Sequence, residues 1–169
     1  MAKRKSIWIL FGILVIGFWM FGSAIQARAE TLKCKSETKQ VTQVNDNLHA
    51  QYYFGITASE GMATCENGET AAVKTFTTWY ADMLKDVSTQ AYIIFTFKDS
   101  SKIIMKANYT QIKDPKGEAN WIWEGTGEII NASSRFIGIK GSSSFKGKQL
   151  FPDKRVVVDY TLTYSLPPK

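Results

Sequence analysis

Apolar and polar residues alternate with a period of two along most of the chain after residue 30. Residues 156–164 (VVVDYTLTY) place Val, Tyr and Leu on one face and Val, Asp and Thr on the other, which is the pattern of a half-buried strand. Residues 91–97 (AYIIFTF) and 102–112 (KIIMKANYTQI) are also rich in strand formers, and the KDSS turn between them predicts a hairpin. Further, weaker strands are predicted at 39–44, 51–57, 71–80, 119–124, 127–131, 136–140 and 143–149.

The connections between these segments are predicted to be turns. Residues 114–117 (DPKG) combine a proline that fixes φ with a glycine that accepts a positive φ. Residues 81–87 (ADMLKDV) are the one plausible helical turn, and they are too short to form an independent helix. Because no long amphipathic helix separates the strands, a parallel α/β sheet is disfavoured. We expect an all-β fold, an antiparallel barrel of about eight strands, with an immunoglobulin-like sandwich as the alternative.

The first 29 residues carry the features of a secretory signal peptide. A basic start (MAKRK) precedes the uncharged residues 7–21, and Ala27 and Ala29 form an A-x-A site. We expect a signal helix here, cleavage between Ala29 and Glu30, and a single barrel domain over 30–169 that is periplasmic or extracellular. The alternative is an uncleaved single-pass anchor, since the apolar run is just long enough to span a bilayer.

The net charge changes once this segment is removed. The 169-residue chain has 21 Lys and Arg against 15 Asp and Glu, whereas cleavage would leave 17 against 15. A nearly neutral protein lacks the concentrated positive charge that nucleic-acid binding requires. The sequence therefore predicts no nucleic-acid partner, and it predicts membrane contact only through an uncleaved signal segment.

Both cysteines, Cys34 and Cys65, belong to the exported part of the chain. In an oxidising compartment such a pair is usually joined, and we predict a structural disulfide between them. The alternatives are two inert free thiols or a redox-active thiol, although the sequence has no C-x-x-C motif.

Closely spaced glycines distinguish residues 121–148 (WIWEGTGEIINASSRFIGIKGSSSFKGK). Glycines between apolar strand residues mark tight corners, bulges or a close approach of the backbone. A phosphate-binding loop is disfavoured, because a strand and not a helix is predicted after the G-x-G. The GTG-x-I, RF-x-GIKG and SF-x-GK segments resemble small secreted β-barrels of the allene oxide cyclase and dirigent type. The residues that carry the resemblance are Gly125, Thr126, Gly127, Phe136, Gly138, Ile139, Gly141, Phe145 and Gly147.

The resemblance spans about residues 92–164 and also includes Asp99 with residues 102–105. It implies an eight-stranded antiparallel barrel of the calycin or allene-oxide-cyclase-like kind, whose interior can hold an apolar small molecule. The chain departs from the pattern at Ser143, where a further glycine is common, and in the longer segment 131–135. No catalytic residue of these families is placed on this sequence.

Side chains suited to catalysis or metal binding are sparse. His49 is the single histidine, and no spaced carboxylate pair accompanies it, so a general base or metal site there is disfavoured. Glu60, Glu66 and Glu69 surround Cys65, but their spacing matches no calcium loop, and a solvated loop is expected. We therefore assign no catalytic residue, no metal and no cofactor.

The expected function is non-enzymatic binding of a small apolar ligand or of an envelope partner, because aromatic rings fill or line a small barrel and ligand pockets are largely apolar. One alternative is a cyclase- or dirigent-type enzyme that acts by confinement, which a buried Glu124 or Asp159 with a shifted pKa would favour. The other is a purely structural envelope protein. The candidate barrel-lining residues are Tyr92, Tyr109, Trp121, Trp123 and Tyr160.

Overall fold

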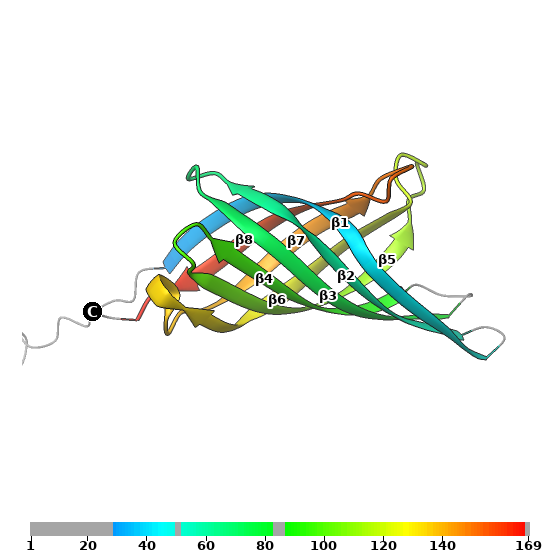
Figure 1. Ribbon diagram of the computed structural model, residues 1–169, viewed down its shortest axis with the longest axis horizontal. Helices are drawn as coiled ribbons and strands as arrows, with labels where there is room; N and C mark the ends of the chain where they lie inside the picture. Colours follow the sequence, from blue (N-terminus) through cyan, green and yellow to red (C-terminus); the bar gives the residue numbers. More distant parts are fainter. Residues whose placement is uncertain (1–28, 50–51, 83–86, 168–169) are drawn as a thin grey trace, which may run out of the picture.

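The computed structural model describes residues 29–49, 52–82 and 87–167 as a closed antiparallel barrel (Figure 1). The predicted all-β barrel of about eight strands is confirmed, and a sandwich is excluded. The predicted signal helix at 1–28 lies outside the described residues. The strands are β1 (Ala29–His49), β2 (Tyr52–Cys65), β3 (Thr70–Asp82), β4 (Val87–Phe97), β5 (Lys102–Lys113), β6 (Trp121–Ser133), β7 (Lys140–Gln149) and β8 (Val156–Ser165).

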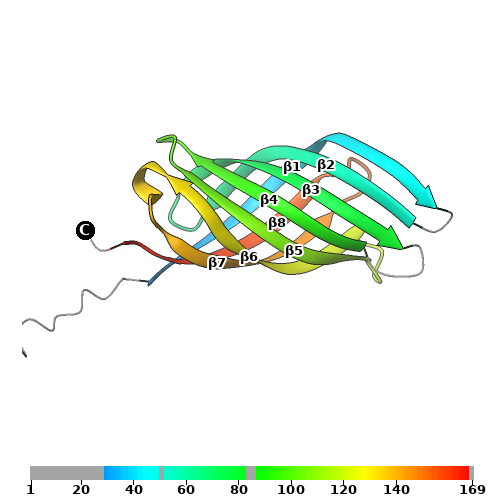
Figure 2. The ribbon, with the colours of Figure 1, turned by 90° about the horizontal axis from the view of Figure 1, so that it is seen from below.

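Closure of the barrel depends on the pairing of its first and last strands. Every strand pairs with the next along the chain, and β1 pairs antiparallel with β8 from Ala29↔Ser165 to Thr38↔Val156. Neither β1 nor β8 therefore has a free sheet edge along this stretch. Beyond Thr38, β1 continues with β2 past the start of β8, so this hairpin projects at one end of the barrel (Figure 2).

Several observed strands are longer than the segments predicted for them. The segment predicted at 39–44 lies within the longer β1, and residues 52–57 of the segment predicted at 51–57 lie within the longer β2, residue 51 being outside the described residues. Residues 121–124 of the segment predicted at 119–124 and the whole segment predicted at 127–131 belong to the continuous β6, which begins at Trp121. The helical turn predicted at 81–87 falls mainly on residues outside the description, and the described residues at its two ends belong to β3 and β4.

The prediction of a strand at 136–140 is wrong. Residues Ser134–Phe136 form a 3₁₀ turn, η1, and Gly138 has a φ of +80°, so the chain turns here before β7 begins. The physical reason is packing, because Phe136 and Ile139 are both buried. Residues three apart point to opposite faces of a strand, whereas the turn buries both.

The end of the barrel where β1 begins and β8 ends (Figure 1) is filled by a hydrophobic core. The Phe136 ring closes this end, with its centroid 5.1 Å from that of Phe97 and 6.1 Å from that of Tyr164. We call this the closed end. Its buried side chains include Leu32, Cys34, Ala63, Cys65, Val73, Phe95, Phe97, Ile103, Met105, Phe136, Ile139, Leu162 and Tyr164.

Arg135 connects three turns over the closed end. Its Nη1 lies 2.6 Å from Glu69 Oε1 and its Nε lies 3.4 Å from Asp99 Oδ2. The guanidinium carbon also lies 5.0 Å and 4.6 Å from the ring centroids of Phe97 and Phe136. The hydrogen bond from Arg135 lowers the pKa of the Glu69 carboxyl, because it favours the ionised form.

Cys34 and Cys65 lie directly opposite each other on β1 and β2 and form the predicted disulfide. Both are buried in the closed-end core, and the chain has no free cysteine. A structural disulfide is typical of proteins in oxidising, exported environments. The predicted cleavage junction Ala29–Glu30 lies at the start of β1, and cleavage there stays a prediction.

Candidate functional site

The barrel is hollow at the end opposite the core. A cavity of about 400 Å³ lies there, toward the ends of β1, β3, β5 and β7 and the starts of β2, β4, β6 and β8. All eight strands contribute side chains to its lining. This volume is in the range of small-molecule sites, roughly 300–1,000 Å³. We call this the open end; the barrel is thus packed at one end and hollow at the other.

Aromatic rings form one side of the cavity. The centroid of Tyr109 lies 6.0 Å from that of Trp123 in a stacked pair and 5.6 Å from that of Phe145 in an edge-to-face pair. Phe145 in turn lies 5.8 Å from Tyr160. These rings support one another at the separations that aromatic pairs favour. We call this group the aromatic wall, and it comprises Trp79, Tyr109, Trp121, Trp123, Phe145 and Tyr160.

Glycines on neighbouring strands let two of these rings lie close against the sheet. Gly55 is opposite Trp79, and a Cβ on it would lie 2.2 Å from the indole. Gly147 is opposite Trp123, and a Cβ on it would lie 2.3 Å from that indole. The rings therefore occupy the space where a cross-strand side chain would stand. The close approach predicted for the glycine-rich segment is confirmed at Gly147.

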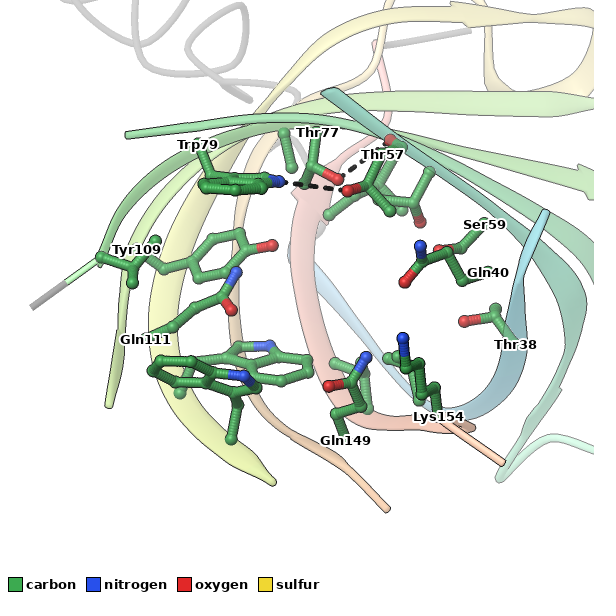
Figure 3. A pocket seen from close by; sticks show the side chains of 18 of the residues that line it. Thr38, Gln40, Thr57, Ser59, Thr77, Trp79, Tyr109, Gln111, Gln149 and Lys154 are labelled. Atoms are coloured by element: carbon green, nitrogen blue, oxygen red, sulfur yellow. Dashed lines mark hydrogen bonds between the residues drawn. The ribbon is translucent and has the colours of Figure 1, made fainter. Parts of the chain in front are cut away.

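Uncharged hydrogen-bonding groups form the other side. Figure 3 shows Thr38, Gln40 and Ser59 across the cavity from Trp79 and Tyr109. These groups come from β1, β2 and β3, whereas the aromatic wall comes mainly from β5 to β8. We call them the polar wall, which comprises Thr38, Gln40, Gln43, Thr57, Ser59, Thr75 and Thr77.

Hydrogen bonds fix part of the polar wall and join it to the aromatic wall. The Trp79 indole N–H donates to Thr57 Oγ1 at 3.2 Å, and the Thr77 hydroxyl donates to the Thr57 carbonyl at 3.1 Å (Figure 3). On β1 the Gln40 amide donates to Gln43 Oε1. The amides and hydroxyls retain further donors and acceptors for a ligand.

Two phenols of the aromatic wall are kept neutral by their surroundings. Burial raises the pKa of Tyr109 and of Tyr160 well above the ordinary value of 10, because the phenolate would lose its hydration. At neutral pH both hydroxyls are therefore protonated and can donate or accept a hydrogen bond.

A single charged side chain occurs among the described lining residues. Lys154 lies in the β7–β8 connection at the open end, and Figure 3 shows its side chain among those that surround the cavity. Its backbone φ is +56°, in the left-handed region that non-glycine residues seldom adopt. The turn thus holds an ammonium group at the entrance of the cavity, whose other described lining residues are uncharged.

The prediction that Tyr92 lines the cavity is wrong. Its side chain is 42% exposed on the outer face, because the alternation of β4 turns Ala91 and Ile93 inward. The other four predicted lining residues border the cavity, and their role in ligand binding stays a prediction. They are Tyr109, Trp121, Trp123 and Tyr160.

Several lining residues were missed by the sequence reasoning. Trp79 and Phe145 belong to the aromatic wall, and the entire polar wall was unassigned. A signal for part of it exists in β3, where Thr75, Thr77 and Trp79 occupy alternate positions that face inward. Polar residues on an inward strand face are a sign of a cavity, because a packed interior would leave them without partners.

The acidic residues considered from the sequence point away from the cavity. Glu124 is exposed on the outer face and lies 2.7 Å from Lys146, and Asp159 is also exposed. Glu60 was expected in a loop but lies in β2, where its carboxylate is 2.8 Å from Lys74. Neither Glu124 nor Asp159 is therefore the buried carboxylate that would favour an enzyme acting by confinement.

Neither a metal-binding cluster nor a membrane-spanning helix occurs in the part of the chain that the structure describes. His49 ends β1, and its side chain lies outside the description. No group of three or more His, Cys, Asp or Glu among the described residues could hold a metal ion. No described helix combines the length and apolar character needed to cross a membrane.

Comparison with known proteins supports the fold. No family model matches the chain, and no curated protein matches it. A crystal structure of a conserved protein of unknown function from Rhodopseudomonas palustris is similar, with a TM-score of 0.57 and 11% sequence identity over 80% of this chain and 98% of that chain. At this identity the similarity shows a shared barrel fold and carries no function from one protein to the other.

Proposed function

We propose that this protein is an exported, non-enzymatic barrel that binds a small amphiphilic molecule in its cavity. The observation that carries the proposal is the division of the interior into a filled closed end and a hollow open end. A purely structural barrel needs no such space, because eight strands can be filled by their own side chains. The expectation of an apolar ligand is refined by the polar wall, which favours a molecule with one apolar face and one hydrogen-bonding face.

The cavity is held open before any ligand enters. The indole of Trp79 is bound to Thr57 and lies over Gly55, and the indole of Trp123 lies over Gly147. These contacts restrain the rings near the barrel wall. A site that is already formed loses less conformational freedom on binding, which favours affinity.

The groups in the described lining favour binding over catalysis. They are hydroxyls, amides, rings, aliphatic side chains and one ammonium. The phenols of Tyr109 and Tyr160 have raised pKa values, so they are poor proton donors and poor bases at neutral pH. Such groups recognise a ligand by shape and hydrogen bonding.

The exported location is part of the proposal. The buried Cys34–Cys65 disulfide supports an oxidising compartment, and the signal-peptide pattern at 1–29 supports export. The relation to allene oxide cyclase and dirigent barrels is also proposed. Its support is the closed antiparallel barrel together with the strand glycines that carry the resemblance.

Binding of a neutral fluorescent probe tests the proposed function. We would titrate the exported protein with N-phenyl-1-naphthylamine and follow the emission of the probe. We expect saturable binding to the wild type. Ala91→Phe should abolish it, because Ala91 lines the cavity and is fully buried. The matched control is Ala72→Phe, which places the same ring on the exposed face of β3 and should leave binding unchanged.

The alternatives predict other results. A purely structural barrel would show no saturable binding to the wild type. A protein that binds partners on its outer surface would be affected by Ala72→Phe at least as strongly as by Ala91→Phe. Circular dichroism of both variants verifies that each keeps its β structure, and Ala91→Leu supplies a smaller filling change if Ala91→Phe does not fold.

A further inference from the structure

The position of Lys154 distinguishes it from the other cations of the open end. It is the one charged side chain among the described residues that line the cavity. Among the described residues it takes part in no ion pair and no cation–π contact, whereas Lys113 lies 4.6 Å above the Trp121 ring outside the cavity lining. Its ammonium is therefore available to a molecule that enters the cavity.

The residue next to Lys154 engages the carboxylates near it. Arg155 Nη1 lies 2.8 Å from Glu37 Oε1, and Arg155 Nε lies 3.6 Å from Asp153 Oδ2. The Arg155 backbone N–H also donates to Asp153 Oδ1 at 3.1 Å, which shapes the turn. The local acids thus face Arg155, and the positive charge of Lys154 is left without compensation at the entrance.

The left-handed backbone conformation of Lys154 supports a functional role for this residue. A φ of +56° costs a lysine more than it would cost a glycine or an asparagine. Residues held in such regions occur preferentially at binding and catalytic sites. Here the conformation accompanies a side chain that borders the cavity (Figure 3).

We propose that the natural ligand is an amphiphilic organic anion whose charged group pairs with Lys154. This inference rests on the proposed function, because it names the chemical class of the molecule bound in the same cavity. The apolar body would lie deeper, against the aromatic wall and beside Ala91 and Ile93. The polar wall would accept or donate hydrogen bonds along one side of the molecule.

The charges of the site fit this orientation. An anion at the entrance keeps part of its hydration while it gains the attraction of Lys154, so the desolvation cost is smaller than for a fully buried charge. Deeper in the cavity the described lining is uncharged, which suits the apolar part of an amphiphile. A cationic ligand would instead meet repulsion at the entrance.

A pair of probes that differ in charge but not in shape tests the inference. We would measure the Kd of 2-naphthoate and of its neutral amide, 2-naphthamide, for the exported protein. The wild type should bind the naphthoate about five- to tenfold more tightly, the effect of a charge-assisted contact that is partly solvated. High salt should reduce this preference, because it screens exposed charges.

Variants at Lys154 then assign the preference to one side chain. Lys154→Met should remove it, so that the two probes bind with the same Kd, and Lys154→Arg should keep it. The matched control is Lys148→Met, which removes an exposed cation of β7 that lies outside the cavity lining and should retain the preference. These are surface substitutions, so the barrel should fold in each case.

Each outcome separates the inference from the proposed function. Equal affinities of the wild type for both probes, or a preference that survives Lys154→Met, would overturn the anion assignment and leave cavity binding intact. If neither probe nor N-phenyl-1-naphthylamine binds, the proposed function fails and the anion assignment fails with it.

Discussion

Gly147 lies directly opposite Trp123 on the neighbouring strand, and a Cβ at this glycine would come within 2.3 Å of the indole ring. The missing side chain of one residue is therefore the space that the other residue fills. Gly55 and Trp79 repeat this relationship on β2 and β3. Two of the largest side chains in the protein are placed against the sheet in this way, and the interior beside them remains hollow.

Gly147→Ala tests this relationship. The added methyl group should displace the Trp123 indole and destabilise the fold by about 1–3 kcal/mol, the usual cost of overpacking. In the background Trp123→Leu the same change should cost much less, because the ring with which it collides is gone. Chemical denaturation of the four proteins gives the coupling energy. Equal costs in the two backgrounds would contradict the proposed collision.

The disulfide should contribute strongly to stability. The double variant Cys34→Ala and Cys65→Ala removes a buried cross-link between residues that are 31 apart in sequence. We expect a loss of about 2–4 kcal/mol in the free energy of unfolding. Reduction of the wild type should produce a similar loss, and it should have no effect on the double variant. A wild type that is equally stable with and without reductant would contradict this prediction.

Arg135 should stabilise the closed end in a pH-dependent way. Because the pKa of Glu69 is lowered from 4.5 in the folded protein, the ion pair adds stability above that pH, and this stability is lost as the pH falls and Glu69 becomes protonated. Arg135→Met should cost about 1 kcal/mol at neutral pH, and the difference should shrink in acid. Lys74→Met, which removes an exposed pair on the outer face, is the control and should cost less. A difference that does not depend on pH would show that Arg135 acts through its ring contacts alone.

Three tyrosines should ionise late in an alkaline titration. Burial raises the pKa of Tyr164 to about 12 and raises that of Tyr109 and Tyr160 further. Because these folded-state pKa values lie above the unfolded value of 10, the contribution of these groups to stability is full below that pH and is lost as the pH rises. Ultraviolet absorbance should show a first group of ionising tyrosines, and then a late group that ionises as the protein unfolds. A single early transition with the fold intact would contradict this.

The sequence predicted the barrel because its strands alternate clearly. In β8, Val158, Tyr160 and Leu162 all face the interior as the period of two requires. The same reasoning found four of the cavity residues. It misplaced Tyr92 because adjacent strand residues are both hydrophobic there, and periodicity alone does not say which of the two faces turns inward.

Other features depend on contacts between strands that no single segment contains. Phe136 and Ile139 are both buried because the chain turns over the closed end between them. The glycine opposite Trp79 is on another strand, so its function is visible only once the register is known. The polar wall likewise becomes a site only when inward threonines and glutamines of β1 to β3 face the rings across the cavity.

A crystal structure of the exported protein grown with N-phenyl-1-naphthylamine shows most directly whether the barrel holds a small molecule. We expect the probe inside the open end, with its rings against the aromatic wall and with Trp79 and Trp123 still over their glycines. An interior in which these indoles have moved to fill the space, with the probe absent or bound only on the outer surface, would contradict the claim that this barrel is built to hold a small molecule.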